Sequence, residues 1–362
     1  MDQDQPKFVR RQRYKGTHPK SFTVKYKELQ PELYAEEITK VKNQGRTPAG
    51  MHRSICVKEI LEILNVIPGQ IGLDATLGYG GHSLEILKCL FPSTDPLDVK
   101  YDKQKYGRLY GIDVDPFELP RTRDRLAGLG FGDEKLVIRK LNFSGIDQII
   151  STSGLLNFVL ADLGVSSMQI DNPDRGFSYK FDGLLDLRLD PTTGKSASTL
   201  LKNISQSELE KLLIENADEP YAKAISKCIV EKISQGVEIN TTVHLQKIIK
   251  DALLFLPKFR IKEDVKKSCQ RSFQALRIEV NDEFGALDKF LEKLPDSLSK
   301  GGRVAILSFH SGEDRRVKKS FQRLFREGIY EDVAPDPIRA STEECNTNPR
   351  ARSAKLRWAI KA

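Results

Sequence analysis

Three glycines behind a short apolar run could hold the backbone close against a ligand. The run 71–74 ends in a carboxylate, and the glycines follow before an amphipathic segment begins: Gly78, Gly80 and Gly81. Glycine adopts positive φ at little steric cost, and the first N–H groups of a helix lack intrahelical partners. A strand, a tight turn and a helix in this order are typical of a nucleotide-binding crevice, so we expect a ligand at the turn.

The turn lacks what phosphate-bearing ligands need. The dinucleotide fingerprint has a third glycine where this chain has Ser83, which disfavours NAD. The phosphate loop of nucleoside triphosphatases has a lysine directly behind its last glycine, whereas Lys88 lies well past the turn. The ligand expected at the turn is therefore a cofactor without phosphates.

Asp113 bears on which phosphate-free cofactor the turn binds. It ends the apolar run 109–112, and an acidic residue at the tip of the second strand can accept hydrogen bonds from both ribose hydroxyls of a nucleoside. The alternative is that Asp113 only caps the next helix. A glycine-rich turn with a ribose-binding aspartate suits S-adenosylmethionine.

Alternating strand and helix patterns must position these residues. Apolar runs that end near Leu73, Ile112 and Ala161 are separated by helical patterns, which predicts an α/β fold with a doubly wound, mainly parallel sheet. Strand patterns at 303–307 and 356–360 complete the sheet.

Between the sheet patterns the chain is helical only. Ser205 and Glu208 form a capping box that starts one helix, and further helices are expected over 221–234 and 242–254. We therefore predict an inserted all-helical substrate domain. The predicted bounds are 1–50 for a basic N-terminal arm, 51–168 and 270–362 for the sheet domain, and 169–269 for the insertion.

The charge of the chain makes a polyanionic partner plausible. The net charge is +8 and the pI about 9.0, although charge alone fits a basic protein without nucleic acid equally well. Residues 1–50 hold 11 Lys/Arg against 6 Asp/Glu. This arm is interpreted as an RNA contact, an organelle-targeting segment or a solvated tail; its acidic residues and few serines count against targeting.

The cysteines and the apolar runs bear on the compartment. Five cysteines stand singly, so neither a disulfide framework nor a structural zinc site is expected, which fits a reducing compartment. No apolar run approaches the ~18 residues that span a bilayer, and the start lacks the apolar core of a secretory signal. We expect a soluble cytoplasmic protein.

A series of motifs in order closely resembles the RsmH (MraW) family. The resemblance covers roughly residues 52–359 and rests on His52, 73–82, 162–167, Gln169, 175–178, 182–190, 273–281, 308–311, 313–315 and 348–353. It implies a Rossmann-like S-adenosylmethionine methyltransferase with an inserted helical domain. The implied reaction methylates the exocyclic N4 of a cytosine in the decoding region of small-subunit ribosomal RNA, within an assembled or nearly assembled subunit. Gly312 departs from the pattern, because the family usually has leucine there.

The resemblance also implies a set of cofactor-lining residues: Gly80, Gly81, His82, Asp113, Phe143, Asp162 and Gln169. Phe143 could lie against the adenine ring, with ordinary core packing as the alternative. His82 is expected to orient the cofactor rather than to move protons.

The implied chemistry is modest. A sulfonium methyl is already activated, so the enzyme mainly holds the cytosine N4 in line at near-attack distance. An acceptor that draws an amine N–H out of the ring plane raises its nucleophilicity, and a base must take the proton. Asp162 is the first candidate for this acceptor and base, and His310 is the second. A histidine behind a strand is otherwise a structural hydrogen-bonding residue, which is the alternative for His310.

No metal site is expected. Asp182, Asp186 and Asp190 surround Arg188, which indicates an ion-pair network instead. Basic residues that could contact phosphates, some of them ordinary surface residues, are Arg271, Arg277, Arg315, Arg316, Arg350, Arg352, Lys355 and Arg357. Aromatic residues on which an extruded base could stack are Phe177, Tyr179 and Trp358.

Two rival functions stay open. A DNA amino-methyltransferase would carry a Pro-Pro-aromatic motif, whereas Leu-Gly-Val follows Asp162. A non-catalytic assembly factor would bind ribosomal RNA and keep the crevice as a scaffold, but the cofactor-lining positions are all intact. The oligomeric state is not predicted.

Overall fold

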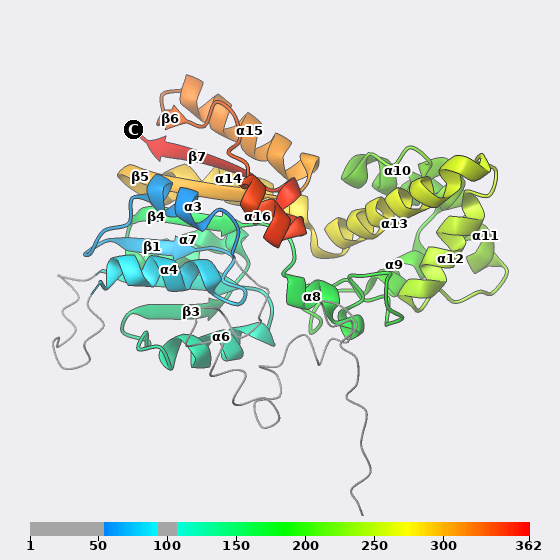
Figure 1. Cartoon of the computed structure of the whole chain (residues 1–362), viewed down its shortest axis with the longest axis horizontal. Coiled ribbons are helices and arrows are strands. Elements are labelled where there is room, and N and C mark those ends of the chain that lie inside the picture. Colours follow the sequence, from blue (N-terminus) through cyan, green and yellow to red (C-terminus); the bar gives the residue numbers. More distant parts are fainter. Residues whose placement is uncertain (1–53, 93–106) are drawn as a thin grey trace, which may run out of the picture. The chain divides into compact units, whose positions relative to one another are not determined.

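The computed structural model describes residues 54–92 and 107–362. Within them, one sheet of seven strands has the order β3-β2-β1-β4-β5-β7-β6 (Figure 1). The strands are β1 (Ile71–Asp74), β2 (Arg108–Asp113), β3 (Leu136–Lys140), β4 (Leu156–Asp162), β5 (Leu298–Ser308), β6 (Tyr330–Val333) and β7 (Lys355–Lys361). Neighbours among β1 to β5 pair in parallel, whereas β7 runs antiparallel to β5 and β6. The predicted mainly parallel sheet is confirmed.

The strand order reverses at β1, which lies between β2 and β4. In open α/β sheets, ligands bind beyond the carboxyl ends of the strands at such a reversal. β1, β2 and β4 end in Asp74, Asp113 and Asp162. These carboxylates therefore share one sheet edge.

Both faces of the sheet are covered. Along β4, Phe158 and Leu160 belong to one buried cluster, and the alternate residues Val159 and Ala161 belong to another. Such strands are apolar nearly throughout because neither face meets water. The first cluster includes side chains of α3 (Val57–Leu64), α4 (Gly81–Leu90) and α6 (Glu118–Ala127). The second includes those of α7 (Ile146–Ser153), α14 (Glu283–Ser297) and α15 (Ser311–Arg326).

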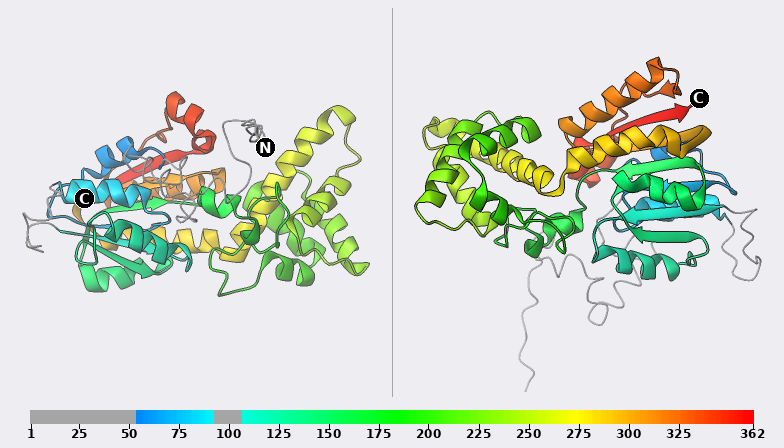
Figure 2. Two further views of the ribbon diagram at one scale, coloured as in Figure 1. Left: turned by 60° about the horizontal axis from the view of Figure 1, so that its bottom comes forward. Right: turned by 180° about the vertical axis from the view of Figure 1, so that it is seen from behind.

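A separate apolar cluster belongs to the helices that precede α14. They are α9 (Ala197–Asn203), α10 (Gln206–Ala217), α11 (Ala222–Ser234), α12 (Thr242–Ala252) and α13 (Lys258–Asn281) (Figure 2). The predicted capping box is present, since the Ser205 hydroxyl accepts from Glu208 N–H and the Glu208 carboxylate accepts from Ser205 N–H. α13 runs through position 269 without a break. The domain bounds proposed from the sequence stay predictions, and the predicted arm lies outside the described residues.

Shorter elements connect these parts. They are η2 (Phe143–Gly145), α8 (Ser167–Asp171), η3 (Pro173–Arg175), α16 (Thr342–Thr347) and η4 (Pro349–Ser353). Among the helices of the described ranges, none combines the length and the hydropathy that crossing a bilayer requires.

Candidate active site

The glycine turn behind β1 is held from three sides. Gly78 N–H donates to Asp113 Oδ2 at 2.7 Å, and the Thr122 hydroxyl donates to the Gly78 carbonyl at 2.6 Å. The Arg125 guanidinium donates to the Tyr79 carbonyl and lies over the Tyr79 ring, 4.1 Å from its centroid. Because Thr122 and Arg125 belong to α6, that helix fixes the turn from outside the motif.

The two positive-φ glycines of the turn face different surroundings. Gly80 has φ 75°, and a Cβ there would lie 2.9 Å from Thr122 Cγ2 and 3.0 Å from Leu126 Cδ1. Gly78 has φ 48°, but a Cβ there would meet only the Thr76 carbonyl oxygen, at 3.9 Å. Gly80 is thus required by the packing of α6. Gly78 lies beside open space that a ligand can approach.

Asp113 closes the turn through its carboxylate. Its Oδ2 accepts from Gly78 N–H, and its Oδ1 accepts from Asp115 N–H at 3.0 Å. Burial raises the pKa of Asp113, and the two backbone donors oppose that rise. The N–H groups of Phe117 and Glu118 at the start of α6 are instead bonded to Asp115 Oδ1. The side chain that pairs with the first N–H groups of α6 is thus Asp115 and not Asp113. Ribose binding by Asp113 stays a prediction.

Asp115 is a buried hub that the sequence analysis missed. Its Oδ2 accepts from Gln169 Nε2 at 2.8 Å and from Arg175 Nη1 at 2.7 Å. The other end of the Gln169 amide, Oε1, accepts from Ser166 N–H and completes the capping box of α8. Both ends of Gln169 are therefore engaged by protein groups. The predicted contact of Gln169 with the cofactor remains untested.

Asp162 and His82 meet where β4 ends and α4 begins. His82 Nε2 lies 2.9 Å from the carbonyl oxygen of Ile55, which can only accept, so Nε2 carries a hydrogen. His82 Nδ1 faces Asp162 Oδ2 at 3.5 Å. Two bare acceptors at that distance would repel, so the pair is stabilised when it shares one proton.

The second oxygen of Asp162 is unusual. Oδ1 is buried and has no hydrogen-bond partner among the described residues. Burial raises the pKa of Asp162 to about 6; His82 opposes the rise, and the charges of Asp74 and Glu313 add to it. An unpaired buried acceptor is costly unless something else pairs with it. Oδ1 is therefore an acceptor that no described protein group uses, although the atom itself is shielded from solvent and the exposed part of the side chain lies elsewhere.

His310 lies one strand away, at the same edge of the sheet. Asp162 is the register partner of Leu307 in β5, and His310 follows that strand. His310 Nε2 lies 3.1 Å from Glu313 Oε1, while Glu313 Oε2 accepts from Phe309 N–H at 2.9 Å. Although burial opposes ionisation, the hydrogen bond from His310 and its charge lower the pKa of Glu313. His310 is thus tied to the start of α15.

Glu283, His310 and Glu313 are close enough together to hold a cation, with ligand atoms within 4.8 Å of one another. However, Glu283 already accepts two bonds from Arg277, at 2.8 and 2.9 Å. The guanidinium supplies the positive charge that an ion would bring. The carboxylates also have hydrogen-bond donors, whereas neither buried ring nitrogen of His310 makes a hydrogen bond of ordinary geometry within the described residues.

Phe143 packs on the apolar core. Its ring lies edge-on to Phe290, with centroids 5.3 Å apart. Phe143 thus takes part in ordinary core packing, which was the alternative to a cofactor contact. A contact of its ring with adenine stays a prediction.

The charged cluster that was predicted as an ion-pair network contains two pairs. Arg188 makes two bonds of 2.7 Å with Asp186, and Asp190 Oδ2 lies 2.7 Å from Lys140 Nζ. Lys140 ends β3, so the second pair joins the segment that leads into the helices to the sheet.

The prediction of a phosphate contact is wrong for two of the basic residues. Arg357 is 4% exposed and bonds Asp314 at 2.6 Å, and the guanidinium of Arg277 is paired with Glu283. Exposed positions of that set include Arg315 and Arg352. Of the proposed stacking residues, Phe177 and Tyr179 pack against the helical core.

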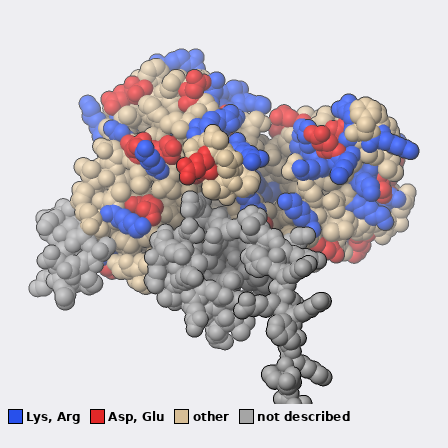
Figure 3. Space-filling model, in the orientation of Figure 1, with Lys and Arg blue, Asp and Glu red and all other residues tan. Residues whose placement is uncertain are grey.

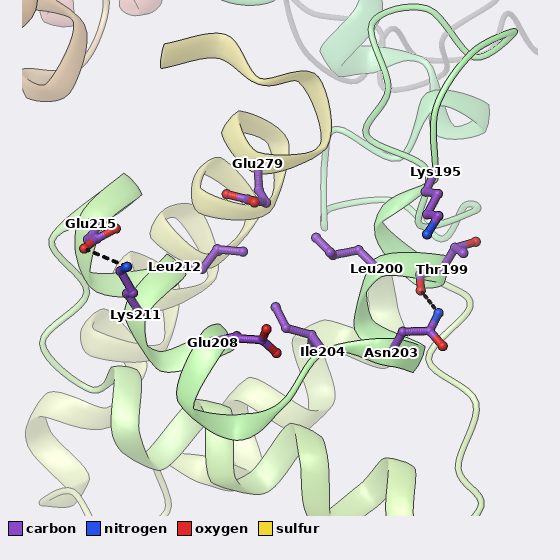
Figure 4. Close-up of a pocket in the computed structure, with 10 residues that line it drawn as sticks. All are labelled: Lys195, Thr199, Leu200, Asn203, Ile204, Glu208, Lys211, Leu212, Glu215 and Glu279. Carbon is purple, nitrogen blue, oxygen red and sulfur yellow. Dashed lines mark hydrogen bonds and ion pairs between the residues drawn. The ribbon is translucent and has the colours of Figure 1, made fainter. Parts of the chain in front are cut away.

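A groove among the helices is separate from these residues. It has a volume of about 380 Å³, and its wall combines the apolar side chains of Leu200, Ile204 and Leu212 with charged groups (Figure 4). Lys211 and Glu215 point toward each other, and Glu208 belongs to the capping box. None of the predicted catalytic or cofactor residues lines it.

Comparisons with known proteins cover nearly the whole chain. A family model described as "MraW methylase family" matches residues 49–362. "Ribosomal RNA small subunit methyltransferase H 2" of Alkaliphilus metalliredigens is 65% identical over 362 residues, 100% of both chains. "Ribosomal RNA small subunit methyltransferase H 1" of Lachnoclostridium phytofermentans is 60% identical over 361 residues, covering 100% of this chain and 95% of that protein. A protein of Halorhodospira halophila named "Ribosomal RNA small subunit methyltransferase H" is 38% identical over 344 residues, which cover 90% of this chain and 99% of that protein.

Proposed function

The chain belongs to the MraW methylase family, and we propose that it methylates the exocyclic N4 of a cytosine in the decoding region of small-subunit ribosomal RNA. It is a methyltransferase that uses S-adenosylmethionine. The ribosomal substrate is supported by the names of relatives that are 65% and 60% identical over essentially the whole chain. The cytosine N4 is supported by the motif resemblance.

The residues at the sheet edge fit the donor. Gly78 borders open space at the turn, and Asp162 Oδ1 is a buried acceptor without a described partner. The residues proposed to hold the donor are Gly80, Gly81, His82, Asp113, Phe143, Asp162 and Gln169. When bound, S-adenosylmethionine supplies a methyl group that its sulfonium already activates.

Asp162 is proposed as the group that accepts a hydrogen of the cytosine amine. Its Oδ1 is free to take an N–H, which draws the nitrogen lone pair out of conjugation with the ring. The proton released by methyl transfer then lies on the Asp162 carboxyl. Oδ2 of the same carboxyl faces His82 Nδ1 at 3.5 Å, so the pair, which holds no proton between these two atoms at the start of the step, shares this one afterwards. The single observation that carries this role is the unpaired, buried Oδ1.

The test uses small subunits purified from cells that lack this protein. Incubation with methyl-tritiated S-adenosylmethionine should label one cytosine in the small-subunit RNA, and Asp162→Asn should abolish the label even when the donor concentration is raised to saturate the variant. Label in purified DNA but not in RNA would favour the DNA amino-methyltransferase. Binding of S-adenosylhomocysteine without transfer by the unaltered protein would favour the assembly factor.

The substrate form and the compartment are further parts of the proposal. We expect assembled or nearly assembled subunits to be labelled in preference to naked small-subunit RNA, because decoding-region nucleotides take their geometry from the folded subunit. The proposed compartment is the cytoplasm, where such subunits are assembled. Equal labelling of naked RNA would contradict the first expectation.

A further inference from the structure

The junction of α12 and α13 exposes three large apolar side chains within six residues. Leu254 is 61% exposed, Phe255 66% and Phe259 86%. Leu253, next to them, is fully buried, so the junction is anchored in the helical core. The exposure is therefore a property of a fixed surface. Large exposed apolar patches on a soluble protein mark interaction sites.

The segment that contains these side chains is rich in cations. Residues 247–267 include seven Lys or Arg and three Asp or Glu. Arg260 pairs with Asp264 and Lys267 with Glu263, which uses two of the three acidic residues. Figure 3 shows Lys and Arg side chains gathered on the helical region. The junction is thus apolar at its centre and positive around it.

The lysines on α13 are spaced so that they repel one another. Lys258, Lys262 and Lys266 are exposed and recur every four residues, which places them on one helix face beside Phe259. The first turn of α13 contains no acidic residue, although the positive end of the helix dipole favours one there. This arrangement opposes helix stability by itself, and an anion bound along the face would relieve it.

One of the aromatic rings is held in place by the neighbouring helix. Phe255 lies edge-on to Tyr221, with ring centroids 6.2 Å apart. The Tyr221 hydroxyl donates to Asp264 at 3.2 Å, and Asp264 also pairs with Arg260. The ring of Phe255 is consequently pre-ordered before any partner binds.

We propose that this aromatic and basic patch, made of Leu254, Phe255, Phe259, Lys258, Lys262 and Lys266, binds a single-stranded stretch of ribosomal RNA. Unstacked bases lie on the faces of Phe259 and Phe255, and the phosphates between them contact the lysines. A protein partner would match the apolar centre equally well, but seven cations against three acidic residues favour a polyanion. The choice of ribosomal RNA rests on the proposed function.

The experiment measures RNA affinity of the full chain, with small-subunit ribosomal RNA and an oligouridylate as probes. Phe259→Ala should weaken binding to both by roughly 5-fold to 100-fold, the loss of one stacked base. Phe259→Trp should retain the affinity, because an indole also stacks. It should also add fluorescence that RNA quenches, over the signal of Trp358, the single tryptophan of the chain. Lys258→Ala with Lys262→Ala should lower the salt slope of the binding constant by about 1.4.

Phe325→Ala is the matched control, because Phe325 is 45% exposed and lies on α15. Equal weakening by that variant, or unchanged RNA affinity of Phe259→Ala, overturns the proposal. So does a loss of self-association in sedimentation, or of binding to phosphatidylglycerol vesicles, while RNA affinity stays intact. If the patch variants lose oligouridylate but the unaltered enzyme methylates no ribosomal RNA, the proposed function fails and the patch stands. If methylation occurs and Phe259→Ala binds normally, only the patch fails.

Discussion

The two oxygens of Asp162 have different partners, and this difference defines what the residue can do. Oδ2 faces His82, whereas Oδ1 is buried without a partner among the described residues. Burial raises the pKa of the carboxyl to about 6, and Oδ1 remains an acceptor that no described protein group uses. A carboxyl that titrates slightly below neutral pH can accept a proton during the reaction and release it afterwards.

Methyl transfer should consequently depend on the ionisation of Asp162. Below pH 6 the carboxyl is protonated and cannot accept, so the single-turnover rate should fall tenfold per pH unit there and level off above pH 7. The rate is measured at saturating donor on small subunits that remain intact over the range. His310→Asn should keep the same acid limb, because His310 is tied to Glu313. Loss of the limb in His310→Asn, with Asp162→Asn still active, would assign the proton to His310.

The same carboxylate should lower stability. The pKa of Asp162 is about 6 in the folded protein, whereas the ordinary value of an aspartate is 3.8. The folded state therefore holds the proton more tightly, and the free energy of unfolding falls as pH rises between these values. Asp162→Asn removes the buried charge, and it should stabilise the protein by about 1 to 3 kcal/mol at pH 8. Below pH 4 the gain should vanish, since both residues are then neutral. Urea unfolding at the two pH values measures this, and equal stability at pH 8 would contradict it.

Single residues also show where sequence reasoning is limited. Asp113 and Asp162 could be placed at the sheet edge because each ends an apolar run, and parallel strands bring such ends together. Arg277 and Arg357 look like surface cations in the sequence, but Glu283 and Asp314 neutralise them in the fold. Neither partner is separable by pattern from other acidic residues. Asp115 was missed because Gln169 and Arg175 reach it only after α8 turns back toward β2.

At the scale of elements, α6 determines the shape of the glycine turn. Thr122 and Arg125 both donate to turn carbonyls, and Thr122 with Leu126 leaves no room for a Cβ on Gly80. The sequence motif shows that glycines are needed but not why. The reason differs at each position, since Gly80 faces a helix and Gly78 faces open space.

Alanine at the two glycines should therefore have separable effects. Gly80→Ala combines positive φ with contacts of about 3 Å, so we expect a loss of about 2 to 4 kcal/mol in stability. Gly78→Ala has only the cost of its φ, about 1 to 2 kcal/mol, but its methyl group enters the space proposed for the donor. Thermal melting separates the stabilities, and calorimetric titration with S-adenosylhomocysteine measures affinity. Gly78→Ala should lose at least tenfold in affinity while remaining folded. Undiminished affinity would remove the donor from that side of the turn.

The helices illustrate what patterns reveal and hide. The capping box at Ser205 and the helix starting at Thr242 have local signals, and both are present. α13 was not predicted at all, although its apolar stripe becomes regular from Val265 onward. In its first half, exposed charges and Phe259 mask that stripe. Gly312, where the family pattern has leucine, has a local explanation. A Cβ there would lie 2.6 Å from Phe284 Cζ, so Phe284 fills the space of the missing side chain.

At the scale of the described chain, two ion pairs join the segment that leads into the helices to the sheet. Lys140 of β3 pairs with Asp190, and Arg175 pairs with Asp115 behind β2. The first is partly exposed to water and the second is almost wholly buried. Water and salt screen an exposed pair, whereas removing one partner of a buried pair leaves an uncompensated charge. The buried pair of Arg175 and Asp115 should therefore contribute more to the free energy of unfolding than the exposed pair of Lys140 and Asp190.

Substitution of each cation by methionine tests this difference. Arg175→Met should cost about 3 to 5 kcal/mol in the free energy of unfolding, because it strands Asp115 with only Gln169 and backbone donors. Lys140→Met, the matched control on the exposed pair, should cost at most about 1 kcal/mol. Adding Asp115→Asn to Arg175→Met should recover only part of the loss. The amide carries no charge and keeps an oxygen for Phe117 N–H, but its NH2 group then faces Gln169 Nε2, which is also a donor. Urea unfolding of the unaltered protein, Arg175→Met, Asp115→Asn and the variant with both substitutions forms a double-mutant cycle. Additive losses across that cycle would mean that Arg175 stabilises the protein mainly through its bond to the Leu189 carbonyl rather than through Asp115.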